Sequence, residues 1–409
     1  MKWLVLLLLA FTSCDQKNTD SIVLPGEWES QEAVWFGWEH RPGVAGYHKA
    51  VFEMIRSIQN QVMVKIVSPT DSIAETAKAA LQAQHFNLKN IQFLTIPDNR
   101  YWIRDHGPTF VQNKQGQQWV VDFAWSRHGN ELPYVDRKAA ELEGLDVITA
   151  DVVNEGGGIE SNGQGTILLV ESMMLDRNPD KTKAEIEAVY RKAVGAKKVI
   201  WLPRGLANDP NGLQLIADDY YGYGVGGHVD EFARFVDPNT IVLAWVEETE
   251  RSSNPVSRLN YDVLNEAFQI LKQATDQDGK PFTIIKIPLP DLITKKMVVT
   301  GEGGGLTDTT LDRSLFEGET VPSVGDTVNF VAAASYTNFL ITNGVVLLPA
   351  YIQAGSSQEK ERNVKEAFSM LFPDRKLIFI DCLYQNHRGG GIHCSTKQQP
   401  KSVPLADYR

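Results

Sequence analysis

Residues 183–202 read KAEIEAVYRKAVGAKKVIWL and contain the unit from which the chain is built. Residues 183–194 favour a helix, and the short apolar run at 198–202, rich in β-branched and aromatic side chains, is typical of a buried strand. The segment therefore predicts one helix that leads directly into one strand.

A helix followed by a strand recurs about five times along the chain, at irregular intervals. Asn343-Gly344, between two apolar runs, also predicts a β-hairpin. The pattern indicates a mixed α/β chain, although its self-similarity is too faint to prove a repeat. The other predicted helices span residues 47–58, 72–85, 259–275 and 359–372, and the strands after them span 62–67, 93–96, 282–287 and 377–380.

The first residues resemble an export signal. Lys2 precedes the apolar run 3–10, so residues 1–13 are predicted to be a signal peptide that is removed. Small residues before Cys14 resemble a bacterial lipoprotein cleavage site, at which this cysteine is lipidated; cleavage without lipidation is the alternative. Residues 14–22 are predicted to be a flexible tether and residues 23–409 a single domain, exported to the cell envelope and held there only by the lipid anchor.

Charge and cysteine content narrow the possible partners. The chain carries 40 basic and 51 acidic residues, a net charge of −11, which argues against nucleic-acid binding and favours a cationic small molecule. Besides Cys14 there are only Cys382 and Cys394, so no disulfide framework is expected. Cys382 follows the apolar run 377–380 and is expected in the core.

Cys394 is a candidate nucleophile. Residues 389–396 read GGGIHCST, and three glycines leave a bare backbone that a substrate can approach closely. A thiol attacks as its thiolate, so a cysteine beside such a channel and a possible proton carrier suits covalent catalysis. The alternative is a small buried apolar side chain, the usual role of a free cysteine.

His228 and Asp230 form a second candidate group. If this segment is extended, residues two apart point to the same face, which places an imidazole base beside a carboxylate. A metal pair or a surface contact is the alternative. However, the chain has no Cys-x-x-Cys or His-Glu-x-x-His spacing for zinc, and no Gly-x-Ser-x-Gly elbow for a serine hydrolase.

Two further acids stand among glycines. Glu155 precedes three glycines after a predicted strand at 147–153, where it either acts chemically or caps a turn, and Asp105 lies in WIRDHGP at 102–108. Carboxylates can hold a planar cationic group, a thiolate can attack its carbon, and an imidazole can protonate departing ammonia. Together these residues suit cleavage of a C–N bond in a guanidinium group.

These motifs resemble the agmatine deiminases and the related bacterial peptidylarginine deiminases of the guanidino-group-modifying (pentein) superfamily. The resemblance covers nearly the whole chain after the leader and implies an α/β fold, a five-bladed pseudosymmetric propeller of β-β-α-β units around a central active-site channel. The matching motifs are LPGEWE (24–29), VWFGW (34–38), WIRD (102–105), EGG (155–157), DRNP (176–179), GHVD (227–230), GGIHC (390–394) and QQP (398–400).

The resemblance also implies roles for individual residues and a reaction that needs no cofactor or metal. Hydrolysis would proceed through a covalent thiouronium intermediate and convert agmatine to N-carbamoylputrescine and ammonia. The implied roles are nucleophile for Cys394, general acid and base for His228, guanidinium binding for Asp105 and Asp230, orientation of His228 for Glu155, and packing along the substrate chain for Trp102.

Three departures from the family pattern bear on the substrate. Gly391 replaces a usual asparagine, residues 220–225 resemble an insertion, and Arg100 replaces a usual acid. Arg100 either favours a substrate carboxylate, as in arginine or peptidyl-arginine, or is a solvated loop residue. A non-catalytic lipoprotein that binds guanidino compounds is the alternative to an enzyme, and the sequence leaves open whether the chain forms a homo-oligomer.

Overall fold

The computed structural model describes residues 22–41, 44–98, 101–124 and 135–402. The predicted signal peptide, Cys14, nearly all of the tether and Arg100 lie outside the described residues, so these assignments stay predictions. Within the described ranges, no helix is both long enough and apolar enough to cross a membrane.

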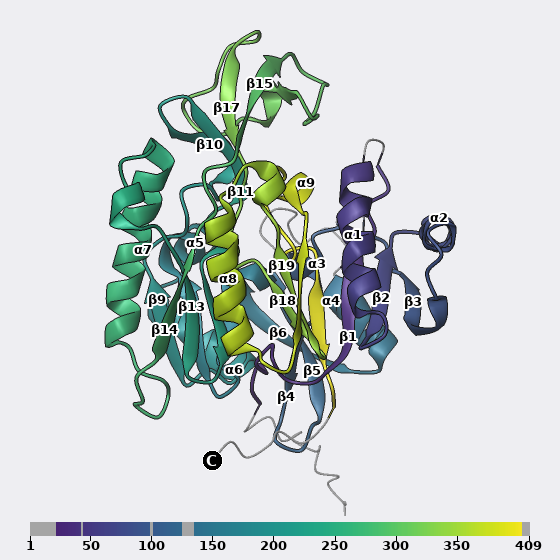
Figure 1. The fold of residues 1–409 in the computed structure, drawn as a ribbon. Coiled ribbons are helices and arrows are strands. Elements are labelled where there is room, and N and C mark those ends of the chain that lie inside the picture. The colour runs from purple at the N-terminus through teal and green to yellow at the C-terminus, as the bar shows by residue number, and fades with distance from the viewer. Residues whose placement is uncertain (1–21, 42–43, 99–100, 125–134, 403–409) are drawn as a thin grey trace, which may run out of the picture.

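Four small sheets of the described chain share one plan, in which an antiparallel pair of strands is followed by helix and then by a strand parallel to the second (Figure 1). The first two are β4 (Thr109–Gln112), β5 (Gln118–Ala124), α4 (Val135–Glu143) and β6 (Asp146–Val153), then β7 (Ile159–Ser161), β8 (Thr166–Val170), α5 (Glu171–Arg177), α6 (Lys183–Ala193) and β9 (Lys198–Leu202). The others are β12 (Ala233–Asp237), β13 (Thr240–Trp245), α7 (Pro255–Gln273) and β14 (Thr283–Pro288), then β18 (Leu340–Thr342), β19 (Val345–Pro349), α8 (Gln358–Leu371) and β20 (Lys376–Ile380).

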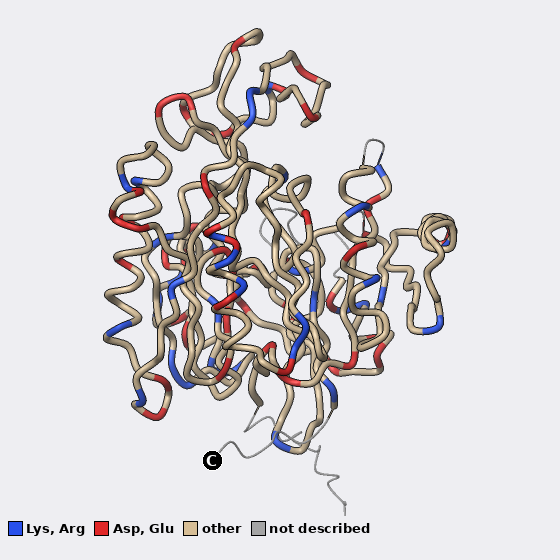
Figure 2. Tube along the Cα trace, viewed as in Figure 1, with Lys and Arg blue, Asp and Glu red and all other residues tan. Residues whose placement is uncertain are grey.

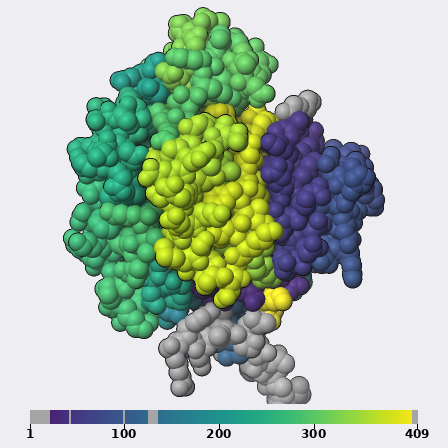
Figure 3. Space-filling model, viewed as in Figure 1, coloured from purple at the N-terminus to yellow at the C-terminus, as the bar shows by residue number. Residues whose placement is uncertain are grey.

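A fifth sheet joins the two ends of the described chain. The last strand, β21 (Lys397–Pro400), is antiparallel to β1 (Gln31–Gly37), which is followed by α1 (Ala45–Ile58), β2 (Met63–Ser68), α2 (Asp71–Ala83) and β3 (Ile91–Thr95). In Figure 3 the N-terminal surface lies directly against the C-terminal one. Five β-β-α-β units therefore close into a ring, which confirms the expected five-bladed α/β propeller.

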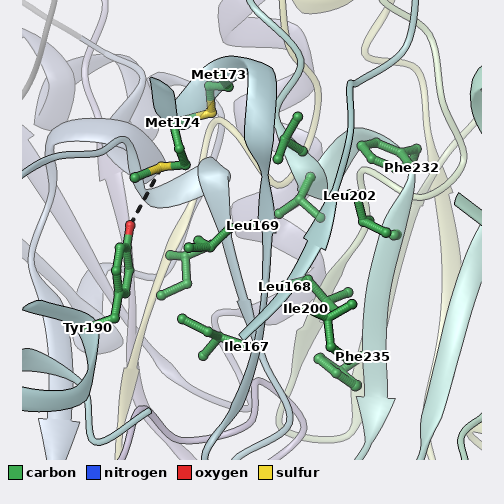
Figure 4. Packing of buried hydrophobic residues seen from close by; sticks show 14 of the residues in the cluster. Ile167, Leu168, Leu169, Met173, Met174, Tyr190, Ile200, Leu202, Phe232 and Phe235 are labelled. Atoms are coloured by element: carbon green, nitrogen blue, oxygen red, sulfur yellow. Dashed lines mark hydrogen bonds between the residues drawn. The ribbon is translucent and has the colours of Figure 1, made fainter. Parts of the chain in front are cut away.

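Each blade is held to its helices by an apolar layer. In the blade of β7, β8 and β9, Ile167, Leu168 and Leu169 of β8 are almost fully buried. The Tyr190 hydroxyl of α6 donates to Met174 Sδ at 3.8 Å (Figure 4). The prediction from residues 183–202 is thus confirmed as α6 followed by β9. Figure 2 shows acidic and basic residues interspersed along the outer elements.

The predicted helix–strand units do not map one to one onto the blades. The predicted unit at 72–96 corresponds to α2 and β3, a second helix and strand in the blade that contains β21, β1 and β2. The helix α4, which belongs to the blade of β4, β5 and β6, was not predicted. The residues that α4 buries include Ala139 and Ala140, whose small side chains give little apolar periodicity.

A sixth sheet projects beyond the ring, at the top of Figures 1 and 3. It contains β10 (Asn211–Ala217), β11 (Tyr220–Val225), β15 (Thr294–Thr300), β16 (Thr310–Asp312) and β17 (Thr327–Val331). The insertion-like residues 220–225 are its strand β11. Because β11 ends just before His228, this sheet is attached directly to the centre of the ring.

Candidate active site

The candidate site residues come from equivalent places in the five blades. Asp105, Glu155, Asp230 and Cys394 each lie on the connection shortly before the first strand of a blade, namely β4, β7, β12 and β21. Asn338 holds the same place before β18. Since these connections meet at the centre of the ring, five segments distant in sequence converge on one site.

The structure brings His228 and three carboxylates together. The His228 Nδ1 atom lies 3.6 Å from Asp105 Oδ1 and 4.0 Å from Asp230 Oδ1, and Nε2 lies 4.0 Å from Glu155 Oε2. All four side chains are buried. A β-carbon on Gly157 would lie 2.5 Å from His228 Nδ1, so the bare backbone next to Glu155 is what allows the imidazole to fit.

Cys394 lies beside the same carboxylates. Its side chain is almost fully buried, and Sγ is 3.7 Å from Asp230 Oδ2, 3.6 Å from Glu231 Oε1 and 3.2 Å from Asn338 Nδ2. Burial, followed by the charges of Asp230, Glu231 and Asp105, raises the pKa of the Cys394 thiol well above its usual range. The empty site therefore favours the neutral thiol.

Asp105 and Asp230, the candidates for guanidinium binding, are buried acids whose pKa values are raised. Burial, and then the charge of Glu155, raises the pKa of Asp105 to about 7. Burial, and then Asp105, raises the pKa of Asp230 well above its usual range. Asp230 Oδ1 is buried and accepts no hydrogen bond from the described residues. A buried carboxylate oxygen in this state is poised to accept a hydrogen bond from a ligand.

Other residues fix this arrangement in place. The Asp209 carboxylate accepts the backbone N–H groups of Gly227 and His228, both at 2.9 Å, and so holds the loop that carries the imidazole. Arg177 Nε donates to Glu155 Oε1 at 3.0 Å, and its Nη2 donates to the Val225 carbonyl at 2.6 Å. The orientation of Glu155 thus depends on an arginine held by the end of β11.

Trp102, predicted to pack along the substrate chain, lies next to the nucleophile candidate. A β-carbon on Gly390 would lie 2.8 Å from Cys394 Cβ and 2.9 Å from Trp102 Cζ3, so this glycine lets the indole approach the cysteine. Cys382, by contrast, is fully buried in an apolar cluster that includes Tyr47 of α1 and Ile380 of β20. Arg100 lies outside the described residues.

Behind the site, His393 connects Asp230 to an ion-pair network. His393 Nδ1 contacts Asp230 Oδ2 at 2.6 Å and Nε2 contacts Glu27 Oε1 at 2.9 Å. Glu27 also pairs with Arg104 and Arg234. Burial alone would raise the pKa of Glu27, but its cationic neighbours hold it well below the usual range.

Sequence reasoning missed Asn338, Glu231, Asp209 and the network around Glu27. Glu231 was not predicted, although it directly follows Asp230 and an acid beside a candidate site residue is a visible signal. Asn338 neither titrates nor stands beside a glycine, so only its place before β18, equivalent to the other four blade positions, could have revealed it.

Among the described residues, two groups of side chains have donor atoms close enough together to hold a cation. Asp230, Glu231 and Cys394 form one, and Glu27, Glu160 and His393 form the other. In the second group both carboxylates already pair with the Arg234 guanidinium. The first group is the one that faces the candidate site.

Comparisons with known proteins identify the family. The family described as Porphyromonas-type peptidyl-arginine deiminase matches residues 23–400. An agmatine deiminase of Pseudomonas putida is 29% identical over 404 residues, which are 94% of this chain and 97% of the relative. The structure of agmatine deiminase of Enterococcus faecalis has a TM-score of 0.73 at 27% identity, with 94% of this chain and 97% of that chain covered. Agmatine deiminase of C. jejuni with substrate bound shares the fold, with a TM-score of 0.68 at 21% identity and coverage of 93% and 97%. The chain therefore belongs to the Porphyromonas-type peptidyl-arginine deiminase family and is a hydrolase that acts on carbon–nitrogen bonds.

Proposed function

We propose that this protein hydrolyses a guanidino compound, with agmatine as its main substrate and N-carbamoylputrescine and ammonia as products. The observation that carries the proposal is the pair of buried acids, Asp105 and Asp230, beside Cys394, with Asp230 Oδ1 lacking a hydrogen-bond donor among the described residues. A guanidinium group supplies both the positive charge and the planar set of N–H donors that this pair lacks. The names of the relatives support agmatine.

Binding of the cation would also activate the nucleophile. Asp105 and Asp230 disfavour the Cys394 thiolate in the empty site, and a guanidinium held between them cancels that effect. As the cation enters, the thiol proton passes to His228, and the thiolate attacks the guanidinium carbon. His228 then delivers a proton to the departing nitrogen, the C–N bond breaks, and ammonia leaves a thiouronium on Cys394.

Hydrolysis of the intermediate completes the reaction. His228, now neutral, takes a proton from a water molecule as its oxygen attacks the same carbon. The C–S bond then breaks while the remaining hydroxyl proton passes to water, which releases the ureido product and returns the thiolate. The proton on His228 becomes available to reprotonate the thiolate. Glu155, held by Arg177, keeps the imidazole oriented through both steps. The overall balance is one guanidine and one water in, and one urea and one ammonia out.

A substrate panel scored for released ammonia tests this proposal. Agmatine, free arginine and a short peptide ending in arginine are compared by kcat/KM, and we expect agmatine to be first. Ammonia from none of the three would refute the proposal. If agmatine also quenched tryptophan fluorescence without release of ammonia, the alternative of a non-catalytic binding lipoprotein would be correct.

Peptidyl-arginine is the second candidate because of two cations near the glycine loop. The Arg388 guanidinium stacks 3.5 Å from the centre of the Tyr384 ring, immediately before Gly389, and forms no ion pair with the described acids. Burial lowers the pKa of Lys295 on β15; the charge of Asp308 opposes this shift and that of Arg388 adds to it, so the two cations lie near each other with one acid in reach. A substrate carboxylate would suit them better than an ammonium would.

Charge reversal separates the two candidates. If the arginine peptide exceeds agmatine by more than tenfold in the wild type, and Arg388→Glu or Arg100→Asp removes that lead, then the enzyme is a peptidylarginine deiminase. If agmatine leads and neither variant changes the ranking, the agmatine assignment stands.

Export and lipidation at Cys14 are part of the same proposal, and mass spectrometry of the mature N-terminus tests them.

A further inference from the structure

The group formed by Asp230, Glu231 and Cys394 has a geometry that the proposed reaction does not require. One ligand atom from each side chain lies within 4.8 Å of the other two. The Cys394 Sγ atom is 3.6 Å from Glu231 Oε1 and 3.7 Å from Asp230 Oδ2. All three side chains are almost fully buried. The reaction uses Cys394 and Asp230, but it leaves Glu231 without a role.

The separations between these atoms are those of ligands around a single zinc ion. Zn²⁺ binds thiolate sulfur at about 2.3 Å and carboxylate oxygen at about 2.0–2.2 Å with tetrahedral angles, so its sulfur and oxygen ligands lie about 3.5–3.7 Å apart. Both sulfur–oxygen distances in the group agree with this spacing. An ion that enters here therefore needs little movement of the three side chains.

Neighbouring side chains hold the three ligand atoms in place. Asn338 Nδ2 lies 2.8 Å from Glu231 Oε1 and 3.2 Å from Cys394 Sγ, and His393 Nδ1 lies 2.6 Å from Asp230 Oδ2. Metal ligands in proteins are commonly oriented by hydrogen bonds of this kind from residues that do not touch the metal. The group is therefore supported from outside in the way that a metal site requires.

A carboxylate oxygen in the group also lacks a partner. Asp230 Oδ1 is buried and accepts no hydrogen bond from the described residues. A bound cation, or a water molecule on that cation, would satisfy such an oxygen. The group of Glu27, Glu160 and His393 differs, because the Arg234 guanidinium already pairs with both of its carboxylates.

We propose that Asp230, Glu231 and Cys394 form a binding site for Zn²⁺ or a similar thiophilic divalent cation, which blocks the catalytic centre reversibly. Cys394 binds the metal as its thiolate, and the thiol proton passes to solvent as the metal–sulfur bond forms. Two carboxylate oxygens and one sulfur then hold the ion, and a water molecule completes the tetrahedron. The bound ion removes the nucleophile and occupies the place beside Asp230 that a guanidinium would take.

The ligand set determines which metals and which substrates compete for this site. A thiolate favours Zn²⁺ over Mg²⁺ and Ca²⁺, which prefer oxygen ligands alone. Because a guanidinium is also a cation and would bind the same acids, metal and substrate should exclude each other. This competition rests on the proposed function, whereas binding of the metal does not.

Cobalt absorption tests metal binding directly in the full chain. Co²⁺ can replace Zn²⁺, and a bond between cobalt and a thiolate gives a charge-transfer absorption that oxygen ligands alone do not give. We expect this absorption when Co²⁺ is added, its loss when Zn²⁺ displaces the cobalt, and no change with excess Mg²⁺ or Ca²⁺. Cobalt that binds without the charge-transfer absorption would overturn the proposal.

Substitutions assign the metal to its ligands. Cys394→Ser should abolish the charge-transfer absorption. Glu231→Gln should weaken Zn²⁺ binding at least about 100-fold, because loss of a ligand costs more than loss of the residue that orients it. Glu160→Gln makes the same chemical change in the other group and should leave the affinity for Zn²⁺ unchanged. If Glu160→Gln rather than Glu231→Gln loses Zn²⁺, the proposal is wrong.

The wild-type protein provides a measurement that needs no variant. At a Zn²⁺ concentration ten times its Kd, alkylation of Cys394 by iodoacetamide should slow about tenfold, and a chelator should restore it. Mass spectrometry of the Cys394 peptide gives the rate, and an unchanged rate would overturn the proposal.

Steady-state kinetics test the competition with substrate. Zn²⁺ should raise KM for agmatine and leave kcat unchanged, because excess substrate displaces the metal. A lowered kcat with unchanged KM would place the metal away from the guanidinium site and overturn the proposal. If the substrate panel releases no ammonia while cobalt binding and protection of Cys394 are observed, the metal site stands and only the proposed function fails.

Discussion

The two oxygens of Asp230 face two regions of opposite charge balance. Behind the site, Oδ2 contacts His393 at 2.6 Å, and Glu27 on the other side of that ring pairs with Arg104 and Arg234. Every carboxylate in this region has a cationic or imidazole partner. On the substrate side, Oδ1 lies 4.0 Å from His228 Nδ1, which is itself 3.6 Å from Asp105 Oδ1, and it accepts no hydrogen bond from the described residues.

We infer that the ion-pair network around Glu27 stabilises the site, whereas the acids on the substrate side take part in its chemistry. Buried charges cost several kcal/mol unless they are paired, so the paired region stabilises the fold whereas the unpaired acids are a strain on it. That strain is relieved when a cation binds. We therefore expect substitutions in the paired region to act on stability, and substitutions on the substrate side to act on function.

The largest expected effect comes from the nucleophile. Cys394→Ser should reduce kcat more than about 10⁴-fold and leave the fold intact, because an alcohol forms essentially no anion near neutral pH. Ammonia release and the unfolding midpoint are the measurements. Cys382→Ser is the control, since Cys382 is fully buried and its Sγ donates to Asn386 Oδ1 at 3.4 Å. An inactive Cys382→Ser beside an active Cys394→Ser would reverse the site assignment.

The second effect should appear in stability. Arg234 is fully buried, pairs with Glu27 and Glu160, and donates to the Phe339 carbonyl at 2.8 Å. Arg234→Met leaves two acids short of a partner and should lower the free energy of unfolding by about 3–5 kcal/mol, measured by urea denaturation.

A surface arginine gives the matched comparison for Arg234. Arg204 lies 3.3 Å from Glu266 with both side chains about half exposed, so Arg204→Met should cost at most about 1 kcal/mol. Equal losses in the two variants would mean that the network behind Asp230 does not stabilise the fold.

The extent to which the sequence predicted this comparison depends on the kind of residue. Glycine-flanked acids, a histidine and a cysteine are visible as motifs, so Asp105, Glu155, His228 and Cys394 could be found, and the structure brings them together. Asn338 could not be found in that way, because an asparagine within Ser-Tyr-Thr-Asn-Phe has no titratable group and no glycine beside it.

The paired region was invisible for a different reason. Glu27 and His393 are 366 residues apart, and nothing local marks either as a partner of Arg234. The same limit applied to the fold, where repeated helix–strand units indicated the class. The assignment of units to blades failed at the helix of residues 135–143, whose buried face is partly alanine. Closure by β21 depends on pairing between the two ends of the chain.

The third prediction is that one substitution, Asp105→Asn, raises stability and lowers function. The pKa of Asp105 is raised to about 7, so folding favours its protonated form, and its charge destabilises the fold increasingly as pH rises from about 4 to about 7. Asp105→Asn removes this penalty and should be more stable than wild type at pH 8, by on the order of 1–4 kcal/mol, with no difference near pH 3.

The same substitution should weaken agmatine binding by about 1.5–3 kcal/mol, because a charge-assisted acceptor is lost. Urea denaturation at both pH values and KM together provide the measurement. A variant less stable than wild type at pH 8 would mean that Asp105 is already balanced by a partner.

The smallest effect is the coupling between substrate charge and thiol ionisation. Burial, and then the charges of Asp230, Glu231 and Asp105, raise the pKa of Cys394 in the empty site. A reagent that carries an amidinium cation should neutralise Asp105 and Asp230 as it binds and so favour the thiolate that it alkylates. At pH 7, 2-chloroacetamidine should modify Cys394 at least about tenfold faster than iodoacetamide does, after correction for their rates with a free thiol. Asp105→Asn should shrink this ratio while it speeds the reaction with the neutral reagent, since one negative neighbour is gone. If the ratio is near one in the wild type, the unpaired acids do not control the nucleophile, and the contrast between the two sides of Asp230 concerns stability alone.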